Sequence, residues 1–243
     1  MSSADRLPIN RPARRAGALS ALALSLLLTA CATPEDESAQ ATGDAQSDTS
    51  AQLRDIGEDL ARRDSDDPFA RGDVDAPVVM VAWSDYHCPF CGQWVRETQP
   101  ELVEDYVETG ELRIEWREFP YLGEDSTTLA HAAYAAGQQD LFWEFHEDYF
   151  AEEREQHSGA DLEAEIDEIA DETGLDSEQL RDDMDTTEAE EHTQADFDAG
   201  QELGINGTPA FFVNGEPVLG AQPTPTFVEA IESALDDAGE GTD

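Results

Sequence analysis

PVVMVAWSDYHCPFC, residues 77–91, carries the pattern that says most about this chain. Its first part, residues 77–83, is a continuous apolar run rich in β-branched residues, which is typical of a strand buried on both faces of a sheet. Helical spacing follows at Val95, Thr98, Leu102 and Tyr106. Cys88 and Cys91 therefore fall where a strand ends and a helix begins, and Pro100 is expected to kink that helix without ending it.

The chain beyond this helix returns to a strand pattern and then to a long helical one. Residues 112–119 alternate apolar and charged side chains, which predicts a second strand. Residues 126–203 hold five amphipathic segments at helical spacing, and Asp176 is placed to cap the fourth. A helical block is therefore expected after the second strand.

A hairpin signal follows the helical block. Apolar runs at 210–213 and 217–219 flank the pair Asn214-Gly215, which favours a tight turn between two strands. Residues 226–235 then show helical spacing. The predicted order is β, α, β, a helical block, a β-hairpin and α.

The first thirty residues have the order of an export signal. Arginines precede residues 16–30, a run made mostly of Ala and Leu, so residues 1–30 are predicted to be a removable signal peptide. The run ends in Leu-Thr-Ala followed by Cys31, which resembles the bacterial lipobox and implies that Cys31 is diacylated. The alternative is an ordinary signal with an incidental cysteine, which would leave an unpaired thiol in an oxidising compartment.

Residues 31–66 are expected to form an acidic, flexible tether. They are rich in small polar and acidic residues and contain too few apolar ones to build a core. Leu53, Ile56 and Leu60 are spaced for a short amphipathic turn within it. The folded domain is expected at residues 67–243.

The charge balance excludes two classes of partner. The chain has 57 Asp and Glu against 13 basic residues, all of them Arg, for a formal net charge of −44. Such a surface repels nucleic acid and anionic lipid headgroups, so the predicted lipid on Cys31 is the expected membrane contact. The absence of Lys fits a protein that works in concentrated salt, where self-repulsion is screened, and equally a genome that favours Arg codons.

Cys88 and Cys91 are spaced to close a small disulfide at the start of a helix. The unpaired backbone N–H groups and the dipole of that helix start favour an anion, which stabilises a thiolate on Cys88. A stabilised thiolate favours the reduced form and makes the disulfide more oxidising, while Cys91 is suited to resolve mixed disulfides. Half of a zinc site has the same spacing, but a second pair of cysteine ligands is absent.

Several segments together resemble the DsbA-like thioredoxin-fold thiol:disulfide oxidoreductases. They are APVVMVAWSDYHCPFC at 76–91, REFP at 117–120, HAAYAA at 131–136, FWEFH at 142–146 and GTPAFFVNG at 207–215. The likeness covers about residues 67–235. It implies an α/β thioredoxin fold with a helical insertion, at about 126–203, between the second strand and the strand that follows a cis proline.

The resemblance also implies the roles of four residues. Cys88 and Cys91 are the catalytic cysteines, and Pro209 occupies the place of a cis proline that faces them. The bend at that proline would present the backbone of Thr208 to an extended substrate, which could pair with it as an added strand.

The residues around the cysteines depart from the best-known member of the family. Phe90 stands where that protein has His, so it supplies no charge to a thiolate, and Pro89 precedes it. His87, directly before Cys88, is the candidate for an electrostatic contribution. These departures leave the direction of the redox reaction open.

Together these features predict an enzyme, an extracytoplasmic thiol:disulfide oxidoreductase anchored to the membrane by lipid. It would exchange disulfides with exported proteins that carry cysteine pairs, with oxidation as the expected direction, and a membrane redox partner would restore its state. No cofactor and no metal are expected. Three alternatives remain: a reductase or isomerase of the same fold, a lipoprotein that holds copper or another soft ion through Cys88, Cys91 and His87, and a passive peptide-binding module.

Overall fold

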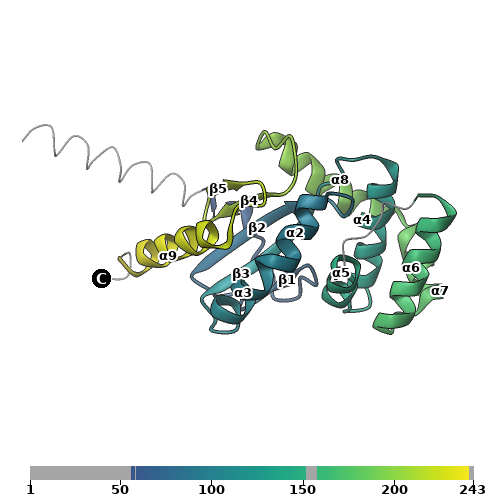
Figure 1. Cartoon of the computed structure of the whole chain (residues 1–243), viewed down its shortest axis with the longest axis horizontal. Helices are drawn as coiled ribbons and strands as arrows, with labels where there is room; N and C mark the ends of the chain where they lie inside the picture. Colours follow the sequence, from purple (N-terminus) through teal and green to yellow (C-terminus); the bar gives the residue numbers. More distant parts are fainter. Residues whose placement is uncertain (1–55, 58, 152–157, 241–243) are drawn as a thin grey trace, which may run out of the picture. The chain divides into compact units, whose positions relative to one another are not determined.

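The computed structural model describes residues 56–57, 59–151 and 158–240 (Figure 1). The expected export signal, Cys31 and residues 31–55 of the expected tether lie outside the described residues. None of the helices in the described part is both long enough and apolar enough to cross a membrane.

A five-stranded sheet forms the centre of the domain, with strand order β1-β3-β2-β4-β5. β2 and β3 run parallel, and every other neighbouring pair is antiparallel. All the predicted strands are confirmed, and all seven residues of β2 are buried. The strands are β1 (Ala70–Arg71), β2 (Val78–Ser84), β3 (Leu112–Glu118), β4 (Ala210–Val213) and β5 (Glu216–Leu219).

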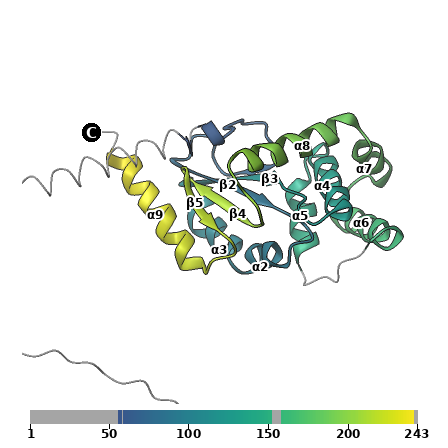
Figure 2. The same cartoon turned by 90° about the horizontal axis from the view of Figure 1, so that it is seen from above.

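Helices cover both faces of this sheet (Figure 2). On one face Trp94 of α2 and Phe227 of α9 pack against Phe211 of β4. On the other face lies α8, where Gly200 permits a close approach, since a Cβ there would meet the rings of Phe119 and Trp83. Residues 56–57 and 59–60 are helical. The helices after them are α2 (Pro89–Glu97), α3 (Gln99–Leu102), the π-helical turn η1 (Val103–Val107), α4 (Glu124–Gly137), α5 (Phe142–Phe150), α6 (Ala160–Thr173), α7 (Ser177–Met184), α8 (Thr187–Glu202) and α9 (Thr224–Glu240).

The helical insertion is confirmed as the segment α4 to α8, between β3 and β4. The cap predicted from Asp176 is also confirmed, because its Oδ1 accepts hydrogen bonds from the backbone N–H groups of Glu178 and Gln179 at 3.0 and 3.1 Å. A capping carboxylate satisfies donors that the first turn of a helix leaves unpaired.

The helix after the cysteines is interrupted at one residue and continues beyond it, in keeping with the kink expected at Pro100, because the hydrogen bonds from Thr98 N to the Trp94 carbonyl oxygen at 2.9 Å and from Leu102 N to the Thr98 carbonyl oxygen at 3.2 Å span the interruption. α2 ends at Glu97, Thr98 has φ −109° and ψ −48°, and the chain then continues as α3 and η1. Pro100 has no N–H to donate to the carbonyl oxygen four residues before it, and its ring crowds that carbonyl. The distortion therefore falls at Thr98, within the turn that precedes the proline.

The charged side chains of β3 are buried. Arg113, Glu115 and Arg117 alternate with the apolar residues of the strand, and each is at most 3% exposed. Glu115 accepts hydrogen bonds from Arg113 Nε at 3.0 Å and from a terminal nitrogen of Arg117 at 2.7 Å. The alternation that predicted the strand therefore puts its charged side chains on one face of the sheet, and that face is covered as well.

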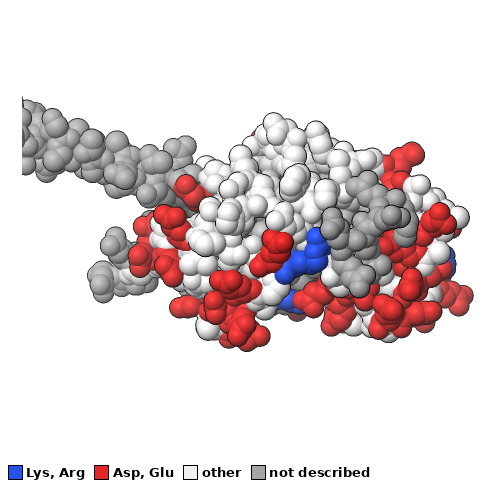
Figure 3. Space-filling view, viewed as in Figure 1, with Lys and Arg blue, Asp and Glu red and all other residues white. Residues whose placement is uncertain are grey.

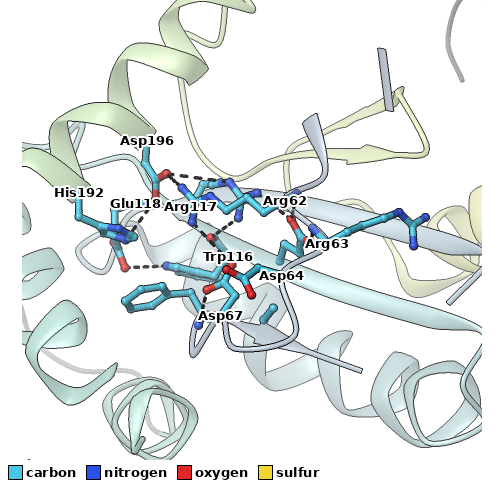
Figure 4. A network of polar contacts seen from close by, with 12 residues as sticks. Arg62, Arg63, Asp64, Asp67, Trp116, Arg117, Glu118, His192 and Asp196 are labelled. Atoms are coloured by element: carbon cyan, nitrogen blue, oxygen red, sulfur yellow. Dashed lines mark hydrogen bonds and ion pairs between the residues drawn. The ribbon is translucent and has the colours of Figure 1, made fainter. Parts of the chain in front are cut away.

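Residues 60–64, within the expected tether, cover this charged face (Figure 4). The backbone N–H groups of Arg62 and Arg63 donate to the Glu115 carboxylate at 2.8 and 3.0 Å. The Arg62 guanidinium also pairs with Asp196 of α8. Burial opposes the charge on Glu115, but the Arg62 N–H and the two neighbouring arginines outweigh it and lower the pKa of Glu115 to about 2. The end of the tether is therefore fixed to the sheet.

Candidate active site

Cys88 lies at the junction of β2 and α2, as the sequence predicted. It is the N-cap residue of α2, with extended backbone geometry and Pro89 at the first helical position. Proline suits that position because its missing N–H would be unpaired there in any case. Cys88 is 6% exposed, Cys91 is fully buried, and Phe90 between them is 61% exposed.

The two thiols are unbonded and chemically different. A hydrogen bond from the Cys91 thiol, together with hydrogen bonds from the Thr208 side chain and from the backbone N–H groups of Cys91 and Phe90, outweighs burial and lowers the pKa of Cys88 to about 6. Burial raises the pKa of Cys91 well above its ordinary value, and the hydrogen bond to Cys88 adds to that effect. Cys88 is thus the thiolate of the pair, and Cys91 keeps its proton.

The loop before β4 brings Thr208 and Pro209 to Cys88. β4 runs antiparallel to β2, with Ala210 opposite Trp83, so the start of β4 lies beside the end of β2. The Thr208-Pro209 peptide bond is cis. The carbonyl oxygen of Thr208 lies 3.4 Å from the Cys88 sulfur. The geometry implied by the resemblance is therefore present, and the substrate-binding role of these residues stays a prediction.

His87 lies directly before Cys88, and a hydrogen bond from its backbone fixes its position. Its side chain is buried, and its N–H donates to Asp85 Oδ1 at 2.8 Å. Its electrostatic role stays a prediction. Two residues beside the site carry no distinctive signal in the sequence: Asp85, and Ser84, which favours a lower pKa of the Cys91 thiol but is outweighed by burial. Asp before a turn is a common turn signal, but its burial depends on the loop after β3, which is distant in sequence.

The two segments that meet at Cys88 carry no acidic side chain. Residues 86–95 and 203–215 contain no Asp, Glu or Arg, although the whole chain is strongly acidic. Figure 3 shows a broad uncharged area on one face, with the acidic side chains gathered away from it. Three of the exposed large apolar side chains of the described residues, Phe90, Tyr121 and Leu122, belong to the active-site helix and to the loop after β3. Such a surface does not repel acidic protein chains.

Metal binding was one alternative for the cysteines. Within the part of the chain that the structure describes, no group of three or more His, Cys, Asp or Glu side chains is arranged to hold a metal ion.

Comparison with known proteins agrees with the fold. A family model described as Thioredoxin matches residues 64–233, well over half of the chain. The chain belongs to the thioredoxin family. Within it the chain is 32% identical over 148 residues to the probable disulfide bond formation protein D of Bacillus anthracis, an alignment that covers 59% of this chain and 68% of the relative.

Solved structures extend the comparison. A thioredoxin-like oxidoreductase from Silicibacter pomeroyi is 34% identical, with a TM-score of 0.61 over 71% of this chain and 94% of the other. Oxidised BdbD from Bacillus subtilis shares the fold, with 24% identity and a TM-score of 0.64 over 69% of this chain and 92% of that one. This member of the thioredoxin family is a DsbA-like thiol:disulfide oxidoreductase.

Proposed function

We propose that this protein is an oxidase that forms disulfides in exported proteins through Cys88 and Cys91. The observation that carries the proposal is the difference between the two thiols, because the pKa of Cys88 is lowered to about 6 while burial raises that of Cys91. A stabilised Cys88 thiolate favours the dithiol over the disulfide, so the disulfide passes readily to a substrate.

The reaction begins with the Cys88–Cys91 disulfide and a substrate that carries two thiols. One substrate thiolate attacks the Cys88 sulfur, the bond between Cys88 and Cys91 breaks, and Cys91 leaves and takes up a proton. The second substrate thiolate then attacks the substrate sulfur of the mixed disulfide, and Cys88 leaves as a thiolate. The substrate loses two electrons and two protons. One of the protons goes to solvent. The protein gains both electrons and the other proton, which leaves it with a Cys88 thiolate and a Cys91 thiol. A disulfide-bearing oxidant must then restore it.

The site around Cys88 supports a peptide substrate. The carbonyl oxygen of Thr208 faces the Cys88 sulfur at 3.4 Å, so an extended chain bound there could pair with the Thr208 backbone. The uncharged surface near Phe90 adds an apolar contact for such a chain. We further propose that the protein works outside the cytoplasm, anchored by lipid on Cys31, where disulfides persist.

Equilibration with glutathione tests the direction of the reaction. The fraction of disulfide, followed by mass spectrometry at fixed ratios of reduced to oxidised glutathione, should give a reduction potential less negative than about −200 mV. In the same conditions the oxidised protein should oxidise a reduced peptide with two cysteines stoichiometrically. A potential near that of thioredoxin, about −270 mV, would instead identify a reductase.

A further inference from the structure

The carboxylate of Asp85 joins two segments that lie far apart in the sequence. Asp85 follows β2 directly and is 1% exposed. Its Oδ1 accepts the N–H of His87 at 2.8 Å, within the turn that leads to Cys88. Its Oδ2 accepts the N–H groups of Tyr121 at 2.7 Å and Leu122 at 2.9 Å, in the loop after β3. One side chain therefore satisfies three backbone donors.

The two segments do not depend on Asp85 to the same degree. The turn keeps backbone hydrogen bonds of its own, from Cys88 N to the Asp85 carbonyl oxygen and from Cys91 N to the Cys88 carbonyl oxygen, both 3.0 Å. The loop after β3 is fixed to the end of β2 through the N–H of Phe119, which donates to the Ser84 carbonyl oxygen at 2.8 Å. Beyond Phe119, the next two N–H groups of that loop, those of Tyr121 and Leu122, both donate to the Asp85 carboxylate.

The loop presents apolar side chains to solvent. Tyr121 is 53% exposed and Leu122 is 50% exposed. The Tyr121 ring stacks on the buried ring of Phe119 at a centroid distance of 6.2 Å. An exposed apolar pair retains its position beside a catalytic turn only if its backbone is held.

We propose that Asp85 is a positioning residue that holds Tyr121 and Leu122 beside Cys88, where they contact an apolar residue of the substrate next to its reacting cysteine. This inference rests on the proposed function and adds a determinant of substrate specificity to it. A buried carboxylate is suited to the task because hydrogen bonds to a charged acceptor are stronger than those to a neutral one.

Steady-state kinetics with two reduced peptides test the role. Both carry two cysteines, one with Leu and the other with Gly beside the first, and glutathione disulfide is the terminal oxidant. In Asp85→Ala we expect the KM for the Leu peptide to rise about tenfold, with kcat changed less than threefold and little change for the Gly peptide. Asp85→Asn keeps one acceptor oxygen and should give an intermediate KM.

Two further variants sharpen the test. Leu122→Ser should raise the KM for the Leu peptide in the same way, and adding it to Asp85→Ala should have little further effect because both remove one contact. Asp176→Ala is the matched control, since it removes a carboxylate that accepts two backbone N–H groups in α7, and it should leave both KM values unchanged. Equal effects of Asp85→Ala on the two peptides would overturn the proposal.

Amide hydrogen exchange of the wild-type protein gives a second measurement that needs no variant. The N–H groups of Tyr121 and Leu122 should exchange at least about a hundredfold more slowly than in an unstructured peptide, although both residues are exposed. Exchange at the unprotected rate would overturn the role of Asp85. If the wild-type protein oxidises neither peptide, the proposed function fails, and exchange still decides whether Asp85 holds the loop.

Discussion

Cys88→Ser should lower the rate of peptide oxidation by about a thousandfold or more, to the rate of the peptide with glutathione disulfide alone. The variant cannot form the active disulfide, and it replaces the one thiol whose pKa is lowered to about 6. The remaining thiol of the pair, Cys91, is fully buried and out of reach of a substrate. The rate is measured by mass spectrometry of the peptide. Oxidation at the wild-type rate would show that the cysteine pair is not the site.

Cys91→Ser is the matched variant and should behave differently. Cys88 stays at the start of α2 and can still form a mixed disulfide, but the neighbouring thiol that would release it is gone. Covalent adducts with substrate should therefore accumulate, visible as larger species on non-reducing gels that disappear with a reductant. Cys88→Ser should give none. Adducts in both variants, or in neither, would contradict the assignment of the two roles.

Glu115→Gln should destabilise the fold by about 3–5 kcal/mol, the cost typical of removing one partner from a buried ion pair. The substitution leaves the guanidinium groups of Arg113 and Arg117 buried without the carboxylate that both of them contact. It also weakens the acceptor for the N–H groups of Arg62 and Arg63, which fix the end of the tether. Urea unfolding of the reduced protein measures the change.

The cost of Glu115→Gln should also depend on pH. Since the pKa of Glu115 in the folded protein is about 2, below its ordinary value of 4.5, its contribution is present above pH 4.5 and is lost as the pH falls towards 2. The difference between wild type and variant should shrink over that range. Glu168→Gln, on the exposed side of α6, is the control and should change stability little. A loss of less than about 1 kcal/mol in the free energy of unfolding at pH 7 would show that the charged face of the sheet contributes little to stability.

Much of the fold could be predicted because its signals are local. The apolar run of β2, the Asn214-Gly215 turn and the Asp176 cap each depend on a few neighbouring residues, and the structure has all three. The two-residue strand β1 was missed because it is too short to show any periodicity. The kink expected at Pro100 corresponds to the one-residue interruption at Thr98, because a proline disturbs the helical turn that precedes it.

The parts of the site that the sequence did not reveal depend on long-range contacts. Cys88, Cys91 and the cis peptide at Pro209 come together as the family resemblance implied. Asp85 could not be singled out, because its role appears only when the loop after β3 lies against it. The burial of Glu115 could not be predicted either. Charged residues that alternate along a strand usually lie on a face exposed to solvent, but here the residues before the domain cover that face.

The proton affinity of the Cys88 thiol is the most direct test of the whole account. Thiolate absorbance near 240 nm, followed against pH in the reduced protein and corrected with Cys88→Ser, should show a transition with a midpoint near 6. A single transition above pH 8, in the range of an ordinary cysteine, would mean that the start of α2 does not stabilise a thiolate, and the proposed oxidase function would lose its physical basis.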